Sequence, residues 1–165
     1  MISTTPAPRR SERPLLRAAP TAASLGPGSA RAGPTTDRSR FLPGDLRRLA
    51  NRLASLWDRE TAWIHDWDPR NAARGQCGTT SLVVQDQLGG RLMRGLVHEG
   101  PGTCTVHYWN RIENARVDLT WQQFGAGATI VATDAVERAD LLTNRWFTTR
   151  YETLGRRLDS AAVQR

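Results

Sequence analysis

Hydrophobic positions recur at helical spacing near both ends of the region from residue 41 to residue 165. After Leu42-Pro43-Gly44-Asp45, which is typical of a helix start, apolar residues follow three or four positions apart. These residues are Leu46, Leu49, Leu53, Leu56 and Trp57. The opposite face carries Arg47, Arg48, Asn51 and Arg52, which we expect to meet solvent. A closing amphipathic helix is predicted from the same spacing of Phe147, Tyr151, Leu154 and Leu158.

A further helix is predicted to begin near Cys77. Gly89-Gly90 is a typical C-terminal stop, and counting back about three to four turns reaches Cys77. Cys77, Ser81, Val84 and Leu88 then share one stripe. The sequence therefore places Cys77 at a helix N-terminus, on the side that turns apolar and faces the rest of the domain.

Alternating and β-branched residues between the helices predict strands over residues 91–98, 103–111 and 116–120. Another short run covers residues 129–133. Gly100, Pro101 and Gly102 separate the first two strands, and Glu113-Asn114 marks the next turn. Helices around such hairpins predict an α+β fold with a small antiparallel sheet and flanking helices.

Side-chain alternation places His107 and Asp118 on one face of the predicted hairpin. Any loop of even length keeps them there, whether a two-residue turn at Glu113-Asn114 or a four-residue loop over residues 112–115. In either case His107 lies opposite Thr120 and diagonal to Asp118. Diagonal neighbours are about 7–8 Å apart between backbones, which long side chains can bridge.

Charge divides the chain into two parts. The 165 residues hold 23 basic residues, all arginine, against 16 acidic ones, for a net charge of +7. Residues 1–40 contribute +5 and are rich in proline, so we expect a disordered leader before one domain over residues 41–165. Nucleic-acid binding through this leader is a disfavoured alternative. No apolar run approaches the length of about 18 residues that would predict a membrane span.

The two cysteines, Cys77 and Cys104, are too few for a disulfide scaffold, which favours a reducing cytoplasm. A disulfide between them is disfavoured because Cys104 alternates away from the face that bears His107. A zinc site that adds His98 fails for the same reason and matches no ligand spacing. We therefore expect no metal or cofactor, and we interpret Cys104 as a small core residue.

Cys77, His107 and Asp118 together suit thiol nucleophilic catalysis. A helix N-terminus and an imidazolium both favour the thiolate, which is the nucleophilic form, and a carboxylate orients the imidazole. Exposed N–H groups at the same helix end can bind a developing oxyanion. Because the chain has no lysine, amine nucleophiles are excluded.

Several sequence blocks resemble the bacterial YunG-like family of uncharacterised proteins. They include Gly75-Gln76-Cys77, the block from His107 to Arg111, Asp118-Leu119-Thr120 and Gln123-Phe124, in the family's order over roughly residues 42–158. The order Cys, His, Asp more distantly resembles transglutaminase-like and papain-like cysteine enzymes. That resemblance implies Cys77 as nucleophile, His107 as general base and Asp118 as orienting carboxylate. Asn71 stands at the position of the papain-like oxyanion glutamine. The candidates for contact with a substrate or an oxyanion are Gln76, Asn71 and Trp109.

Two classes of function follow from these residues. The first is cysteine-dependent acyl transfer, or hydrolysis of an amide or ester, on a small-molecule, peptide or protein substrate that the sequence leaves open. The alternative is a non-catalytic binding module on the same fold, with a ligand groove near four tryptophans. These are Trp63, Trp67, Trp109 and Trp121.

Overall fold

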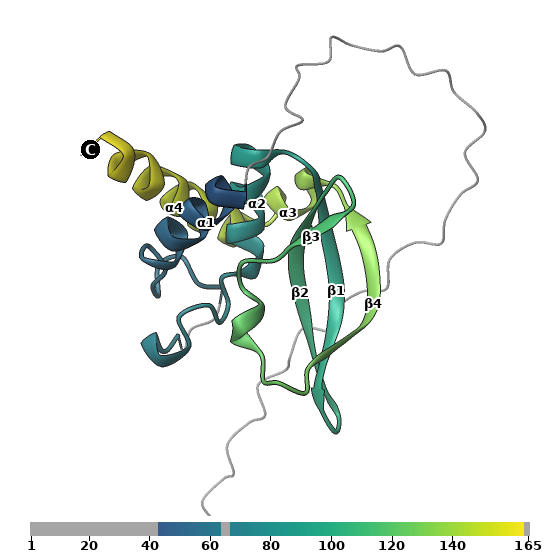
Figure 1. The fold of residues 1–165 in the computed structure, drawn as a ribbon. Helices are drawn as coiled ribbons and strands as arrows, with labels where there is room; N and C mark the ends of the chain where they lie inside the picture. Colours follow the sequence, from purple (N-terminus) through teal and green to yellow (C-terminus); the bar gives the residue numbers. More distant parts are fainter. Residues whose placement is uncertain (1–42, 64–66, 164–165) are drawn as a thin grey trace, which may run out of the picture. The chain divides into compact units, whose positions relative to one another are not determined.

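The computed structural model of the chain describes residues 43–63 and 67–163 (Figure 1). The predicted leader over residues 1–40 lies outside the described residues. The helices are α1 (Pro43–Ala54), α2 (Cys77–Leu88), α3 (Arg138–Leu142) and α4 (Arg145–Val163). The strands are β1 (Arg91–Gly100), β2 (Thr103–Ile112), β3 (Ala115–Val117) and β4 (Thr129–Val136). Two short 3-10 helices, η1 (Pro69–Asn71) and η2 (Trp121–Gln123), lie in the connections.

The four strands form one sheet in the order β3-β2-β1-β4, and each neighbouring pair is antiparallel. In Figure 1 the helices α1, α2 and α4 gather on the side of β2 and β3, while β4 forms the far edge. Mixed helices and a small antiparallel sheet confirm the α+β prediction. Within the described residues, no helix is both long enough and apolar enough to cross a membrane.

Of the two loop lengths considered, the hairpin between β2 and β3 has the two-residue turn at Glu113-Asn114. Ile112 pairs with Ala115 and Asn110 with Val117, so the side chains of His107 and Asp118 project to the same side. Glu113 has φ 52°, which is the left-handed conformation that tight hairpins need. The predicted third strand was too long, because pairing stops at Val117 and Asp118 follows in irregular backbone.

The predicted apolar stripes of α1 and α4 meet in one core cluster. Leu49 and Leu53 pack with Leu154 and Leu158, as the two spacings indicated. Trp57 joins this cluster from just beyond the end of α1. Arg52 differs from the predicted solvated face, since it is half-buried and its guanidinium donates to the Leu158 carbonyl at 2.6 Å.

Helix α2 begins at Cys77, as predicted, but it is not an amphipathic helix with one buried stripe. Every residue from Gly78 to Val84 is buried. Its polar side chains therefore need internal partners. The Thr79 hydroxyl donates to the Thr61 carbonyl at 3.2 Å, and that of Ser81 donates to the Cys77 carbonyl at 2.7 Å. The helix that carries Cys77 is thus enclosed by other parts of the domain.

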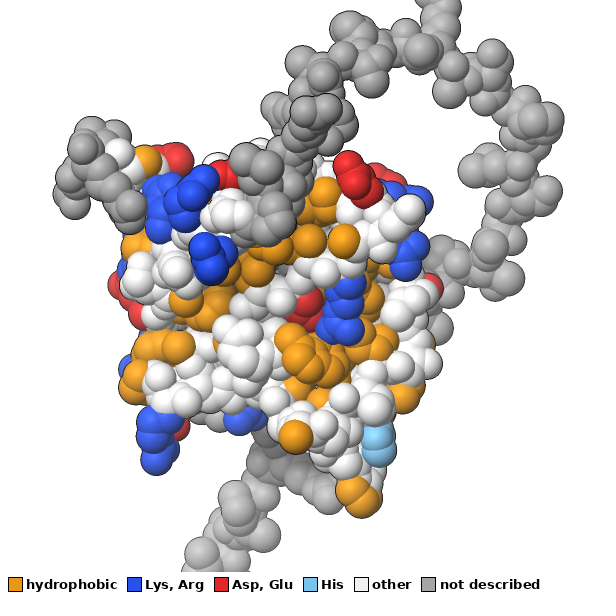
Figure 2. Space-filling view, in the orientation of Figure 1, with side chains coloured by type: hydrophobic (Ala, Val, Ile, Leu, Met, Phe, Trp, Pro, Cys, Tyr) orange, Lys and Arg blue, Asp and Glu red, His pale blue; other side chains and the backbone are white. Residues whose placement is uncertain are grey.

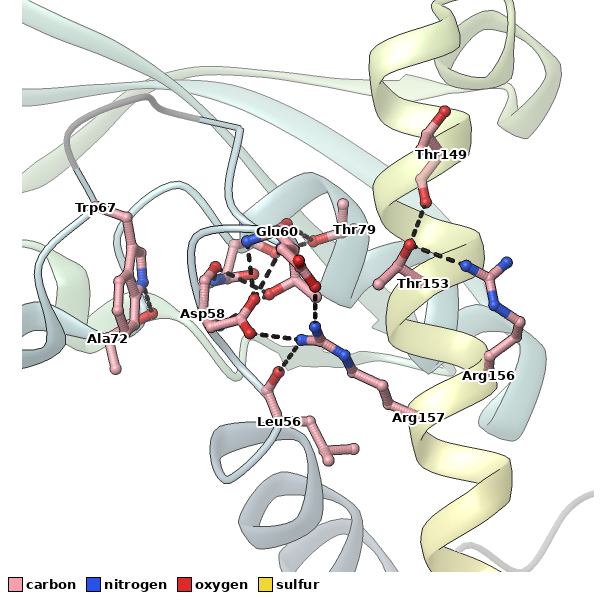
Figure 3. Close-up of polar contacts among 12 residues, drawn as sticks. Leu56, Asp58, Glu60, Trp67, Ala72, Thr79, Thr149, Thr153, Arg156 and Arg157 are labelled. Carbon is pink, nitrogen blue, oxygen red and sulfur yellow. Dashed lines mark hydrogen bonds and ion pairs between the residues drawn. The ribbon is translucent and has the colours of Figure 1, made fainter.

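An arginine of α4 fixes the loop between α1 and α2. Figure 3 shows Arg157 reaching the Leu56 carbonyl and the carboxylates of Asp58 and Glu60. The Asp58 carboxylate also accepts the backbone N–H of Glu60 at 2.8 Å. These contacts hold the pKa of Asp58 below its ordinary value against the opposing effect of burial. The loop ahead of Cys77 is therefore fastened to the C-terminal helix.

Helix α2 covers only part of one face of the sheet. On that face Leu92 is buried, and Asn110 donates its amide to the Ser81 carbonyl at 3.0 Å. Farther along the same strands, Leu96 and Val106 are exposed. Cys104 lies beyond them and is exposed too, so its interpretation as a core residue was wrong. Side-chain alternation identified its face correctly, but the helix does not reach that far.

The other face of the sheet carries His107 and Trp109, both buried. Trp121 from η2 and the adjacent Phe124 pack against the imidazole, with ring centroids at 5.8 Å and 4.9 Å. In the space-filling view hydrophobic side chains gather toward the middle of the visible face, and most charged side chains lie nearer its rim (Figure 2). The His107 side of the sheet is therefore a second, largely aromatic packing region.

Two glycine-to-alanine substitutions in helices should change stability in opposite directions. A Cβ at Gly78 would clash with Cε1 of Phe147, a ring that stacks on Trp63 at 4.6 Å and cannot easily yield. Gly78→Ala should therefore lower the free energy of unfolding by about 1–3 kcal/mol. Gly155→Ala, whose Cβ would meet nothing within 4 Å, should raise it by about 0.5–1 kcal/mol. Urea unfolding measures both, and equal effects would contradict this packing.

Candidate active site

His107 and Asp118 form a buried pair at the point where β3 ends. Nε2 of His107 lies 2.8 Å from Oδ2 of Asp118. The histidine side chain is 0% exposed and the aspartate side chain 6%. Because a carboxylate only accepts hydrogen bonds, Nε2 carries the proton and Nδ1 is the nitrogen left for another partner. The hairpin register thus produces the contact that alternation predicted.

Both oxygens of Asp118 are engaged. Oδ2 also accepts from the guanidinium of Arg116 at 2.5 Å, while Oδ1 accepts from the backbone N–H of Thr120 at 3.2 Å. Burial by itself would raise the pKa of Asp118. The hydrogen bond and charge of His107, the Arg116 hydrogen bond and the Thr120 N–H outweigh it, so that the pKa lies below the ordinary value. Asp118 is therefore an ionised, fixed acceptor.

Cys77 lies close enough to this pair to affect the pKa of His107. It lies half-buried at the first residue of α2, where the leading N–H groups of a helix have no acceptor within it. Burial by itself would lower the pKa of His107. Hydrogen bonding and charge interaction with Asp118 and with Cys77 outweigh burial and raise that pKa to about 9. His107 and Asp118 are therefore in direct contact, and Cys77, from a third segment, acts on the same imidazole.

Gln123 is a site residue that the sequence analysis did not single out. Its amide Nε2 lies 3.3 Å from Nδ1 of His107 and donates to the Thr120 carbonyl at 2.9 Å. Its Oε1 accepts the backbone N–H of Gly75 at 3.4 Å, two residues before Cys77. Gln123 thus links the loop ahead of the cysteine to the imidazole. The only signal for it was its place in the Gln123-Phe124 block.

The two amides proposed as oxyanion donors have partners elsewhere. Gln76 is fully buried, and its Nε2 donates to the Asp58 carbonyl at 2.9 Å, in the loop that Arg157 holds. Nδ2 of Asn71 donates to the Gln123 carbonyl at 3.0 Å. These two side chains therefore join the segment before Cys77 to the loop at Asp58 and to the segment at Gln123.

The four tryptophans expected to line a groove divide into separate groups. Trp109 stacks on His107 at 5.7 Å, and Trp121 packs against the edge of the same ring. Trp63 is 41% exposed and stacks on Phe147, whereas Trp67 donates its indole N–H to the Ala72 carbonyl. Trp109 and Trp121 therefore enclose the imidazole.

Tyr108 lies on the opposite face of β2 from its neighbour His107. Burial raises the pKa of its phenol, and the charge of Cys77 raises it further, while Arg94 acts in the opposite direction. Its ring also meets Phe147 at 5.9 Å. Cys77 thus affects the pKa of His107 and of Tyr108, two neighbours on β2. Within the described residues, no cluster of His, Cys, Asp and Glu is arranged to hold a metal ion.

Comparison with known proteins finds similarity to one family. The family model described as YunG protein matches residues 45–163. A protein described as "Uncharacterized protein YunG", from Bacillus subtilis (strain 168), is 34% identical over 74 residues. That match covers 45% of this chain and 58% of the relative, so the chain aligns with just over half the length of that protein. No solved structure matches the chain.

The charge on His107 should make stability depend on pH. Its pKa of about 9 in the fold exceeds the ordinary value of 6.5, so the stabilisation is complete below about pH 6.5 and is lost as pH rises through about 9. Between about pH 6 and pH 10, the wild type should lose on the order of 3 kcal/mol more unfolding free energy than His107→Gln. Urea unfolding at both pH values tests this, and parallel pH profiles for the two proteins would refute it.

Proposed function

The chain belongs to the YunG family, and from the geometry around its cysteine we propose that it is a thiol enzyme that transfers or hydrolyses acyl groups. In this proposal Cys77 is the nucleophile, His107 the general base and Asp118 the carboxylate that orients the ring. The substrate is an amide, an ester or a thioester. The relationship to transglutaminase-like and papain-like enzymes is part of this proposal and concerns the order and roles of the three residues.

One observation carries the proposal: the imidazole is held by a carboxylate at one nitrogen and interacts with the thiol. Because Asp118 engages Nε2, the proposal assigns the proton from Sγ of Cys77 to Nδ1, the nitrogen that also lies 3.3 Å from the Gln123 amide. The resulting thiolate and imidazolium attract each other, and this attraction is part of what raises the pKa of His107. A histidine with only a structural role in the core would need the hydrogen bond to Asp118, but it would not need a thiol near its ring.

The reaction follows from these positions. Sγ of Cys77 gives its proton to Nδ1 of His107 and forms a bond to the carbonyl carbon, while the carbonyl π electrons move to oxygen. When the tetrahedral intermediate collapses, the bond to the leaving group breaks and the leaving group takes the proton from Nδ1. A thioester on Cys77 remains. Water or an amine then gives a proton to Nδ1 and attacks the thioester carbonyl carbon. The C–S bond breaks, the acid or amide leaves, and Sγ takes the proton back from Nδ1.

In this proposal the N-terminus of α2 stabilises the negatively charged oxygen of the tetrahedral intermediate. The first N–H groups of α2 point away from the helix beside the reacting sulfur, and the helix dipole adds positive potential there. Gln76 and Asn71 support this role indirectly, since their amides already have carbonyl partners that hold the flanking loops.

Thiol labelling across pH tests the nucleophile, with Cys104 as an internal control. Cys104 is exposed and Cys77 half-buried, so accessibility alone predicts faster alkylation of Cys104. We expect the reverse with iodoacetamide near pH 6: Cys77 should react at least about tenfold faster, because His107 favours its thiolate. His107→Ala should abolish this advantage. Mass spectrometry of the two cysteine peptides measures both rates.

Slower labelling of Cys77 than of Cys104 at every pH would contradict the proposal. The same is true if His107→Ala left the Cys77 rate unchanged while Cys104→Ser confirmed that the measured site was Cys77. Either result would favour the binding module, for which Cys77→Ala should leave ligand binding intact.

A further inference from the structure

Arg116 is the solvent-facing member of the cluster around Asp118. Its guanidinium nitrogen lies 2.5 Å from Oδ2 of Asp118, the same oxygen that accepts from Nε2 of His107 at 2.8 Å. The Arg116 side chain is 41% exposed, whereas those of Asp118 and His107 are 6% and 0% exposed. One carboxylate oxygen is therefore shared between a buried imidazole and a cation at the surface.

Two tryptophans hold the guanidinium in this position. Its central carbon lies 4.4 Å from the ring centroid of Trp121 and 5.2 Å from that of Trp109. Both rings also pack against His107. A planar guanidinium can stack on aromatic rings while it donates in its own plane, which a lysine ammonium cannot do. Arg116 thus closes the solvent side of Asp118 with a fixed positive charge.

We propose that Arg116 is a positioning residue that sets the proton affinity of His107 through the Asp118 oxygen they share. An oxygen that accepts from a guanidinium presents less negative potential to the imidazole. Arg116 therefore limits how strongly Asp118 favours the imidazolium. The inference deepens the proposed function, because a general base must return its proton as well as take it.

Among the described residues, the other groups around the imidazole do not limit how strongly it holds its proton. Cys77 acts on the ring from α2 and Asp118 from the segment after β3, and both favour the protonated ring. The segment over η2 presents neutral side chains, Gln123 and Trp121. On β1 the residue opposite His107 is Gly95. Arg116 is thus the cation in this cluster, and it acts through Asp118.

Histidine titration by NMR tests the inference on the resting protein without any substrate. The signal of His107 is assigned by its loss in His107→Gln. Arg116→Gln removes the charge, and Arg116→Met removes it while keeping an apolar stem over Trp121. Arg116→Lys retains a charge. Arg48→Gln, which removes an arginine paired with Asp45 on α1, is the matched control.

Without the Arg116 charge, the pKa of His107 should rise by about 0.5–1 unit, the effect expected of one nearby, partly solvated charge. Arg116→Lys should restore most of the difference, and Arg48→Gln should change nothing. A pKa within about 0.2 unit of wild type in both folded Arg116→Gln and Arg116→Met would overturn the inference, even if both variants were less stable. If Arg116→Gln does not fold, Arg116→Met decides alone.

This outcome separates the inference from the proposed function. A shifted His107 pKa with no special reactivity of Cys77 would support the role of Arg116 and refute thiol catalysis. A reactive Cys77 with an unmoved His107 pKa would do the opposite. In the variants that shift the pKa of His107, the pH dependence of the Cys77 alkylation rate should change as well, which a merely structural arginine would not cause.

Discussion

The buried carboxylate of Asp118 is the constraint on which the site depends. A carboxylate removed from water must find donors for both oxygens or lose its charge. Here a ring on β2, a guanidinium on β3 and a backbone N–H after β3 provide them. The end of β3, the orientation of His107 and the stacking of Arg116 all follow from this requirement. The polar cluster thus determines how the segment from β3 to η2 folds over the sheet.

A second constraint brings the thiol to this cluster. Helix α2 is buried on all sides over its first turns, and Arg157 holds the loop before it. The position of Cys77 is therefore fixed by packing and by hydrogen bonds. Gln123 joins that loop to the imidazole through its amide. The loop before the cysteine and the imidazole of His107 are therefore connected through one side chain, although 30 residues separate Cys77 from His107 in the sequence. Fixed positions of this kind are what the proposed nucleophile and its proposed base require.

Local periodicity predicted the parts of this arrangement that depend on backbone geometry alone. Alternation along β2 and an even turn were enough to pair His107 with Asp118, and the Gly89-Gly90 stop located the start of α2 at Cys77. The error at Cys104 arose because alternation identifies a face but not how far a helix covers it. Gln123 lies in a 3-10 turn without periodicity, and the contacts of Arg116 depend on tryptophans from two different segments. Those features require the tertiary structure.

Trapping of an acyl-enzyme tests the central claim most directly. The full chain is incubated with an activated acetyl ester, quenched in acid and analysed by peptide mass spectrometry, with Cys77→Ala and His107→Ala as matched variants. We predict one acetyl group on Cys77 that appears rapidly in the wild type, appears far more slowly in His107→Ala, and decays when an amine is added. Acetylation confined to Cys104, or an equal rate on both cysteines, would show that Cys77 is not an activated nucleophile.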